Sequence, residues 1–344
     1  MRFSSRGLHN RHHFGNQESV RYGMSIRGIE VEHVDHFEEI LVDQQTLVER
    51  ILEAKRKRNA IILAHNYQRP EIQDIGDYVG DSLGLARKAA QTDAEVIVFC
   101  GVHFMAETAS ILCPRKIVLL PDLHAGCPMA DMANARDVKR AKEQNPGAVV
   151  VSYVNTTAAA KAESDYCCTS SNAVEVVRGI DAGEIIFVPD RNLACYVAAQ
   201  VEDKKIVPWN GYCQIHQNIS VEHILEALEE HPRAEVIAHP ECSGEVLALA
   251  HHIRSTSGMV DAAIASNAEE FVVATEAGMI YPLSKAVPHK KFYPPTVEHL
   301  CPNMKLITLS KVLRSLDTLQ PRVKVPEGIR VNALRAVERM LVPR

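Results

Sequence analysis

The feature that most constrains this chain of 344 residues is an internal repeat with a period of about 87 residues. Five features recur in the same order in each of three copies: an apolar stretch ending in a polar cluster, a Ser/Thr group, a second apolar stretch, a lysine that begins a third element, and a cysteine. The intervals between equivalent residues lie between 85 and 89 residues. The cysteines are Cys127, Cys213 and Cys301. Such recurrence indicates three copies of one structural unit.

Within each copy, short apolar stretches alternate with segments of helical periodicity, which is typical of parallel α/β units. The predicted strands are residues 60–64, 96–100, 117–120, 149–154, 184–188, 205–207, 235–238 and 271–274. The predicted helices include residues 43–58, 82–90, 173–178 and 221–230. A solenoid would need a shorter period or more copies. We therefore expect three Rossmann-like βαβ domains related by a pseudo-threefold axis.

The repeat also gives a division of the chain. The predicted parts are an N-terminal extension (1–44) that is partly disordered, a first domain (45–130) completed by residues 301–344, a second domain (131–217) and a third (218–300). The first 28 residues are basic, with five arginines and one acidic residue. We interpret them as a flexible extension or as residues upstream of a start at Met24, with an organellar transit peptide as the alternative.

Composition excludes several classes of protein. The net charge of −5 and the pI near 6.4 argue against a general nucleic-acid binder, which needs a basic face. No run reaches the 18 or so apolar residues of a membrane span. The nine cysteines are odd in number and include no CxxC pair, unlike a secreted disulfide framework or a zinc ribbon. We expect a cytoplasmic protein without a nucleic-acid or membrane partner.

The three copies should direct their strand ends to one site, because functional residues of parallel sheets gather at the carboxyl ends of strands. Three converging thiolates would hold either a zinc ion with an open position or an iron–sulfur cubane with one open iron. The other six cysteines are expected to be small buried residues: Cys100, Cys113, Cys167, Cys168, Cys195 and Cys242. The Ser/Thr groups before helices would either cap those helices or bind anions there. Candidate proton carriers at the strand ends are His65, Tyr67, Tyr153, His239 and Glu241.

Eleven segments of the chain resemble the motifs of a known family. They are LAHNYQ (63–68), GDS (80–82), FMAE (104–107), GCPMA (126–130), YVNTTAAAKAESDYCCTSSNAVEVV (153–177), PDRNLACYV (189–197), NGYCQIHQ (210–217), HPEC (239–242), STSGM (255–259), TEAGMIYPL (275–283) and CPNMK (301–305). In this order and spacing they resemble the quinolinate synthase A family over about residues 45–344.

The resemblance implies an enzyme of NAD biosynthesis that condenses iminoaspartate with dihydroxyacetone phosphate to quinolinate, with loss of phosphate and two waters. It implies three pseudo-symmetric α/β domains around a central [4Fe-4S] cluster, whose ligands would be Cys127, Cys213 and Cys301. The open iron would act as a Lewis acid in dehydration. A transient contact with an L-aspartate oxidase or dehydrogenase, which would supply iminoaspartate, is a further expectation.

The same resemblance implies roles for residues of the first two copies. His65 and Tyr67 would contact substrate and assist proton transfer. Tyr153 and Asn155 would bind and orient intermediates beside the open iron.

The remaining implied roles concern anions and the general base. Ser82 and Ser170 would hold carboxylates at helix starts, and Thr256 would add an anion contact. His239 and Glu241 would act on the oxygen and protons of the substrate, with Glu241 as general base. Arg254 departs from relatives that have Gly before the Ser-Thr pair, and could alter anion affinity.

Three alternatives stay open at this point. A non-catalytic iron–sulfur sensor would need the cysteines but not the full set of His, Tyr and Glu residues. A zinc hydrolase would use three cysteines and an activated water. A radical enzyme of the diphthamide type also takes one cysteine from each of three domains, but the HNYQ, YVN and HPE segments fit that class poorly.

Overall fold

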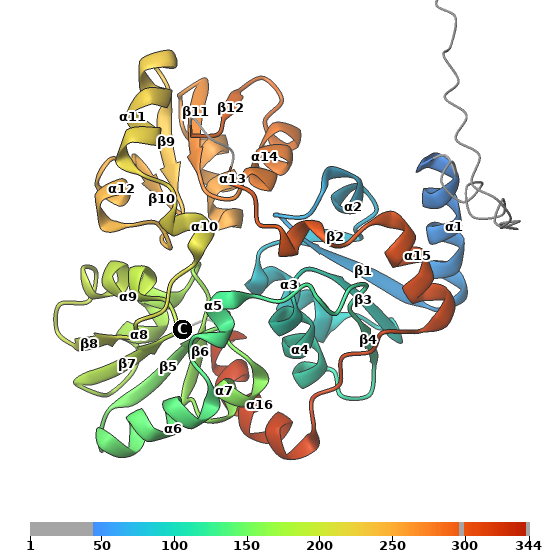
Figure 1. Cartoon of the computed structure of the whole chain (residues 1–344), viewed down its shortest axis with the longest axis horizontal. Coiled ribbons are helices and arrows are strands. Elements are labelled where there is room, and N and C mark those ends of the chain that lie inside the picture. The colour runs from blue at the N-terminus through green and yellow to red at the C-terminus, as the bar shows by residue number, and fades with distance from the viewer. Residues whose placement is uncertain (1–43, 296–298, 342–344) are drawn as a thin grey trace, which may run out of the picture. The chain divides into compact units, whose positions relative to one another are not determined.

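The computed structural model describes residues 44–295 and 299–341 (Figure 1). In these residues twelve strands form three sheets of four parallel strands each. This confirms the predicted α/β class with three parallel units. The predictions for residues 1–43 lie outside the described residues, and the domain limits stay a prediction.

The three sheets share one strand order, in which the first strand of each unit pairs with the second and the third. The first sheet has the order β2-β1-β3-β4, the second β6-β5-β7-β8 and the third β10-β9-β11-β12. The strands are β1 (Ala60–His65), β2 (Tyr78–Gly80), β3 (Val96–Cys100), β4 (Ile117–Leu119), β5 (Val149–Tyr153), β6 (Tyr166–Cys168), β7 (Glu184–Val188), β8 (Lys205–Pro208), β9 (Glu235–Ala238), β10 (His252–Ile253), β11 (Glu270–Ala274) and β12 (Lys291–Tyr293).

Helices connect the strands of each sheet. They are α1 (Gln44–Lys57), α2 (Pro70–Asp74), α3 (Ser82–Gln91), α4 (His103–Leu112), α5 (Pro128–Asp131), α6 (Ala135–Gln144), α7 (Ala158–Ala162), α8 (Ala173–Arg178), α9 (Arg191–Ala198), α10 (Gln214–Gln217), α11 (Val221–Glu230), α12 (Gly244–Ala248), α13 (Thr256–Ala265), η2 (Ala277–Met279), α14 (Ile280–Ala286), η3 (Asn303–Lys305), α15 (Leu309–Thr318) and α16 (Glu327–Leu341). None of these helices is both long and apolar enough to cross a membrane.

The central strands consist of apolar residues, and burial of these residues on both faces of the sheet stabilises the strands. All five residues of β3 are apolar and buried, the pattern of a parallel strand covered by helices on each side. Ile97 of β3 pairs with Ile61 of β1 and with Val118 of β4, so the three strands run in register. Burial of such a side chain contributes roughly 1.5–3 kcal/mol, and a charge there would break the sheet.

The sequence pattern does not predict the edge strands β2, β6 and β10. Each is only two or three residues long, which is too short to show a hydrophobic period. They nevertheless occupy equivalent places in the three sheets. Their positions make Ser82, Ser170 and Thr256 equivalent residues, 88 and 86 residues apart, whereas the sequence alone aligned Ser255 with the first two.

The C-terminal helices connect two of the sheets. Helix α15 packs against α1 and β3 of the first unit. Helix α16 packs against α7 and β6 of the second unit as well as against α3 and α4 of the first, as its place beside α7 in Figure 1 shows. The segment after Cys301 therefore contributes to the packing of both units.

Five of the six cysteines outside the repeat set are buried, as expected: Cys100, Cys113, Cys167, Cys168 and Cys242. Cys195 is exposed, so the expectation of burial is wrong for this residue. Helix α9 turns Leu193, Ala194 and Val197 into the core, and the helical period then places Cys195 on the outer face.

Candidate functional site

All twelve residues singled out from the sequence line one cavity of about 410 Å³. They are His65, Tyr67, Ser82, Cys127, Tyr153, Asn155, Ser170, Cys213, His239, Glu241, Thr256 and Cys301. The cavity has a size typical of sites for small molecules. Each unit contributes one residue at the end of its first strand, one two positions further on, one Ser or Thr at or shortly before the start of a helix, and one cysteine.

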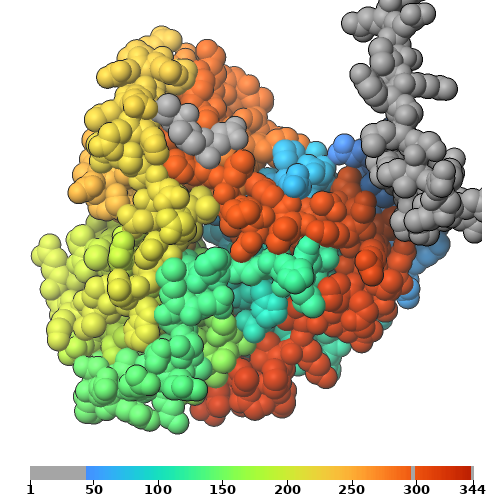
Figure 2. Space-filling model, in the orientation of Figure 1, coloured from blue at the N-terminus to red at the C-terminus, as the bar shows by residue number. Residues whose placement is uncertain are grey.

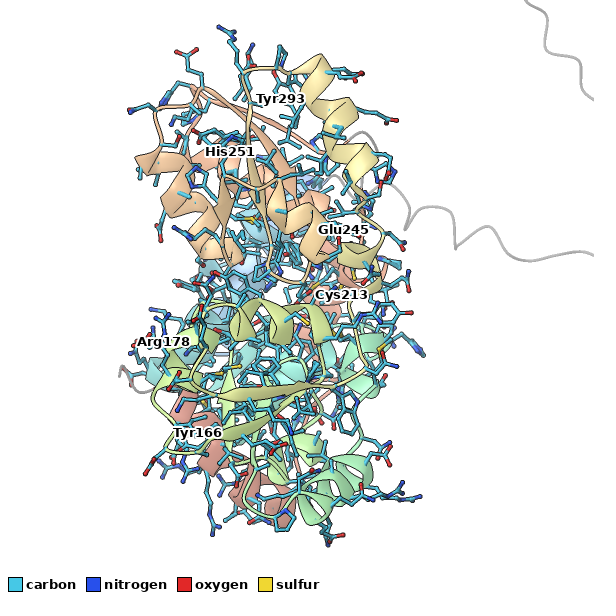
Figure 3. All side chains as sticks on the ribbon, turned by 90° about the vertical axis from the view of Figure 1, so that its left-hand side faces the viewer. Tyr166, Arg178, Cys213, Glu245, His251 and Tyr293 are labelled. Carbon is cyan, nitrogen blue, oxygen red and sulfur yellow. The ribbon has the colours of Figure 1, made fainter. Side chains whose placement is uncertain are left out.

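The cysteines lie on three equivalent loops, each just before a short helical turn: α5 after Cys127, α10 after Cys213 and η3 after Cys301. Figure 2 shows the green segment around α5, the yellow segment around α10 and the orange-red segment after residue 300 meeting on one face. In the side view of Figure 3, Cys213 lies where the second and third units face each other.

Each thiol lies in a similar local environment. Burial raises the pKa of all three thiols, to about 12 for Cys127. The backbone N–H groups two and three residues further on act in the opposite direction at every one of the three sulfurs. A buried thiolate needs a cation opposite it, and N–H groups aimed at the sulfur are typical partners of metal-bound cysteine. Three sulfurs in this environment could hold a positively charged group as thiolates.

Two of the three cysteine loops are also held by carboxylates that follow a strand. Asp190, after β7, accepts a hydrogen bond from the Cys213 N–H at 3.3 Å. Glu276, after β11, accepts one from the Cys301 N–H at 3.0 Å and pairs with Lys305 at 2.8 Å. Neither residue was predicted from the sequence, although the two are 86 residues apart and obey the repeat.

His65 and His239 occupy equivalent strand ends and have the same hydrogen-bonding state. Nδ1 of His65 accepts the Tyr67 N–H at 3.2 Å, and Nδ1 of His239 accepts the Glu241 N–H at 3.3 Å. The proton of each ring therefore lies on Nε2, which faces the site as a donor. Burial lowers the pKa of both imidazoles to about 3, so both are neutral at physiological pH.

Both carboxylate oxygens of Glu241 contact polar side chains of the site. Its Oε1 accepts a hydrogen bond of 2.6 Å from the Tyr153 hydroxyl, and its Oε2 lies 2.8 Å from Nδ1 of His216. Burial alone would raise the pKa of this carboxyl, but the facing His216 and His239 and the Tyr153 hydroxyl outweigh it and lower the pKa. Burial and the charge of Glu241 raise the pKa of Tyr67 and Tyr153, so both keep their phenolic protons.

Of the Ser and Thr residues before the helices, Ser255 caps its helix with its side chain, whereas Ser82, Ser170 and Thr256 do not. The N-cap of α3 is Asp81, whose carboxylate accepts the Gly84 N–H, and Ser255 is the N-cap of α13. Ser82 and Thr256 are therefore the first helical residues, while Ser170 lies in the loop before α8 and contacts Nε2 of His239 at 3.2 Å. The simple capping alternative is thus wrong for Ser82, Ser170 and Thr256.

Two buried polar atoms of the cavity lining lack a hydrogen-bond partner among the described residues: Asn155 Oδ1, and His216 Nδ1, which lies 2.8 Å from Glu241 Oε2. Asn155 Oδ1 is an acceptor. Because an unpaired buried acceptor costs about 1–3 kcal/mol, such an atom in a cavity indicates a missing ligand group.

The structure adds two further residues that had no predicted role. Thr275, directly after β11, lies 2.6 Å from the Tyr67 hydroxyl and 2.8 Å from Nε2 of His216. His216 belongs to the quoted NGYCQIHQ segment, but a histidine three residues after a cysteine gives no separate signal. Among the described residues, Cys213, His216 and Glu241 are the one group of three ligand atoms within 4.8 Å of one another.

Comparison with known proteins agrees with the motifs. The family model described as Quinolinate synthetase A protein matches residues 49–342. The chain is 55% identical to the quinolinate synthase of Methanosarcina barkeri over 300 residues, which are 87% of this chain and 98% of that one. It is 54% identical over 294 residues to the quinolinate synthase of Thermodesulfovibrio yellowstonii, with 86% and 97% covered. The chain therefore belongs to the quinolinate synthetase A family.

Proposed function

We propose that this protein is a quinolinate synthase of NAD biosynthesis, which condenses iminoaspartate with dihydroxyacetone phosphate and releases phosphate and two waters. One observation carries the proposal: three cysteines of equivalent loops line the same cavity as a carboxylate, two neutral imidazoles and two tyrosine hydroxyls. The relatives at 53–55% identity that carry this name support it.

The donor set fits a [4Fe-4S] cluster held by Cys127, Cys213 and Cys301. Each sulfur faces two backbone N–H groups, as described above. A single tetrahedral zinc would need the three sulfurs about 3.8 Å apart, from Zn–S bonds of about 2.3 Å. The three sulfurs do not form a group within 4.8 Å, which favours the larger cofactor. When bound, a cluster with three protein ligands supplies an open iron as a Lewis acid for the loss of a hydroxyl group.

The protein's own groups would divide the remaining work. The Nε2–H groups of His65 and His239 donate to substrate oxygens, and the free Oδ1 of Asn155 accepts from a substrate N–H or O–H. Glu241, ionised and buried, removes a proton during condensation or dehydration.

The anionic groups of the substrates need donors of their own. Ser82 and Thr256 begin helices of ten residues each, whose first N–H groups and positive dipole ends favour a carboxylate or a phosphate. Ser170 adds a hydroxyl beside His239.

The proposal extends to partners and place of action. The substrates are two small molecules, and an L-aspartate oxidase or dehydrogenase would supply iminoaspartate through a transient contact. Action in the cytoplasm suits nine cysteines without a disulfide framework.

The test is turnover by the full chain, purified and reconstituted anaerobically with iron and sulfide. With both substrates we expect quinolinate, and with either substrate alone none. Cys195→Ala is the matched control, because it removes an exposed cysteine outside the cavity. If the reconstituted protein carries a cluster but forms no quinolinate, the proposed function is wrong.

A further inference from the structure

A continuous chain of polar groups crosses the site and joins the three units. It runs from the Tyr67 hydroxyl to Thr275 Oγ1 (2.6 Å), on to His216 Nε2 (2.8 Å), through the ring to Nδ1, across to Glu241 Oε2 (2.8 Å), and from Glu241 Oε1 to the Tyr153 hydroxyl (2.6 Å). Tyr67, Tyr153 and Glu241 come from the first, second and third units. Thr275 and His216 are the two links between Tyr67 and Glu241.

The chain is shielded from solvent along its whole length. The exposed fractions are 8% for Tyr67, 1% for Thr275, 2% for His216, 3% for Glu241 and 4% for Tyr153. Thr275 and His216, the two links, are the least exposed of these side chains, which favours transfer of a proton along the chain over exchange with bulk water. Nδ1 of His216 lies 2.8 Å from Glu241 Oε2 but forms no hydrogen bond in the structure, so this link is a close contact. Proton transfer at this link requires the ring to turn its Nδ1–H onto the carboxylate.

The hydrogen positions of the chain have one consistent assignment when Glu241 is a carboxylate. A carboxylate only accepts, so Nδ1 of His216 carries the ring proton and Nε2 is an acceptor. Thr275 then donates to Nε2 and its oxygen accepts from Tyr67. Every donor between Tyr67 and Glu241 points toward Glu241. His216 therefore has the opposite tautomer to His65 and His239, whose protons lie on Nε2.

We propose that Thr275 and His216 form a proton relay that joins Tyr67 to the general base Glu241. The relay rests on the proposed function and assigns a role in it to these two residues. A proton taken from substrate by the Tyr67 oxygen displaces the phenolic proton to Thr275, the Thr275 proton moves to Nε2 of His216, and the Nδ1 proton moves to Oε2 of Glu241. Each link exchanges one O–H or N–H bond for another, so one proton moves and no group is oxidised or reduced. The reverse sequence returns a proton at Tyr67.

This relay explains how one carboxylate can act at two places. Condensation followed by two dehydrations needs protons removed and delivered at several atoms of a substrate that spans the cavity. Glu241 contacts Tyr153 directly and reaches Tyr67 only through His216 and Thr275. One base would thereby serve both tyrosines.

The chain offers a matched pair of variants at Thr275. Thr275→Val keeps the shape and removes the hydroxyl, and Thr275→Ser keeps the hydroxyl and removes a methyl group. We expect Thr275→Val to lower kcat about 10²-fold, in the range for lost proton transfer, with KM and iron content unchanged. Thr275→Ser should stay within about threefold of the wild type. An equal kcat for Thr275→Val and the wild type would overturn the relay. So would an equal loss of kcat in Thr275→Val and Thr275→Ser.

A second measurement does not depend on turnover. In the full chain labelled with ¹⁵N-histidine, the His216 resonances are identified by their loss in His216→Gln. The relay requires a bare Nε2 and a protonated Nδ1 for His216, and Thr275→Val should shift Nε2 away from its hydrogen-bonded value. A proton on Nε2 of His216 would overturn the relay even if the protein makes quinolinate. The predicted tautomer in a protein that makes none would leave the hydrogen-bond chain intact and refute only the proposed function.

Discussion

Two sets of residues line the cavity. One set is identical in the three units of the repeat, and the other set differs between them. At the cysteine loops the three units supply the same residue in the same local geometry: Cys127, Cys213 and Cys301. At the strand ends the equivalent residues differ, since His65, Tyr153 and His239 occupy one position and Tyr67, Asn155 and Glu241 the position two residues further on.

The difference agrees with the partner that we propose for each set. A symmetric inorganic group can be held by three identical ligands, whereas two unlike substrates need unlike donors, acceptors and a base. The three units therefore supply identical residues where the proposed ligand is symmetric and different residues where the proposed chemistry is not.

The largest effect is expected at the cysteines, and it should be the same for all three. Cys127→Ala, Cys213→Ala and Cys301→Ala should each abolish the brown absorbance of the cluster and the formation of quinolinate, because two thiolates leave two irons without a protein ligand. Absorbance spectra and the quinolinate assay measure both losses. A variant that keeps full absorbance would show that the three loops are not equivalent, and Cys195→Ala controls for the loss of a thiol as such.

The strand-end residues should show unequal effects. Glu241→Gln keeps the size of the side chain but removes the base, so kcat should fall about 10²–10⁴-fold while iron content stays at the wild-type level. Steady-state rates and iron analysis on the same preparation measure this. An unchanged rate would remove Glu241 from the role of base, and a loss of iron would place it in the cysteine set instead.

A smaller effect distinguishes the cysteine loops from one another. Glu276→Ala leaves the Cys301 N–H and the Lys305 ammonium without their acceptor, at a cost of about 1–3 kcal/mol for the N–H alone. No carboxylate follows the equivalent strand in the first unit, where Val102 occupies the position. We expect Glu276→Ala to release iron to a chelator several-fold faster than the wild type.

Glu276→Gln is the control for this variant, because its amide oxygen still accepts the hydrogen bond. It should release iron at close to the wild-type rate. Equal release from the Ala and Gln variants would mean that the Glu276 hydrogen bond does not hold the loop.

The smallest effect is the contribution of two strand-end residues, His65 and His239, to the loss of stability at acid pH. Their pKa of about 3 lies below the ordinary value near 6.5, so between these limits the unfolded chain binds protons that the folded chain does not. Stability therefore falls as pH falls, by about 1.4 kcal/mol per pH unit for each histidine within that window. Urea unfolding at pH 7, 6 and 5 should show a shallower decline for His239→Gln than for the wild type. Parallel curves would mean that His239 is protonated in the folded protein.

The sequence predicted the elements that carry a strong local pattern. The apolar core strands, such as β3, and the helices α8 and α11 lie where the periodicity placed them. The regular spacing of the three cysteines predicted that their loops occupy equivalent positions, and all three line one cavity.

The remaining features depend on tertiary contacts that leave no local signal. The edge strands β2, β6 and β10 pair only because a longer strand lies beside them. Thr275 and His216 gain their place through contacts with Tyr67 and Glu241, which are 208 and 25 residues away in the chain. Cys195 is exposed because neighbouring residues of α9 occupy the core.

The most direct test of the proposed function follows iron, sulfide and turnover together. Anaerobic preparations of the full chain, reconstituted to different extents, are analysed for iron and acid-labile sulfide and assayed for quinolinate. We predict that the rate rises in proportion to the cluster content, up to about four irons and four sulfides per chain. One zinc per chain, or a rate independent of iron, would contradict a cluster at the three cysteines as the centre of the reaction.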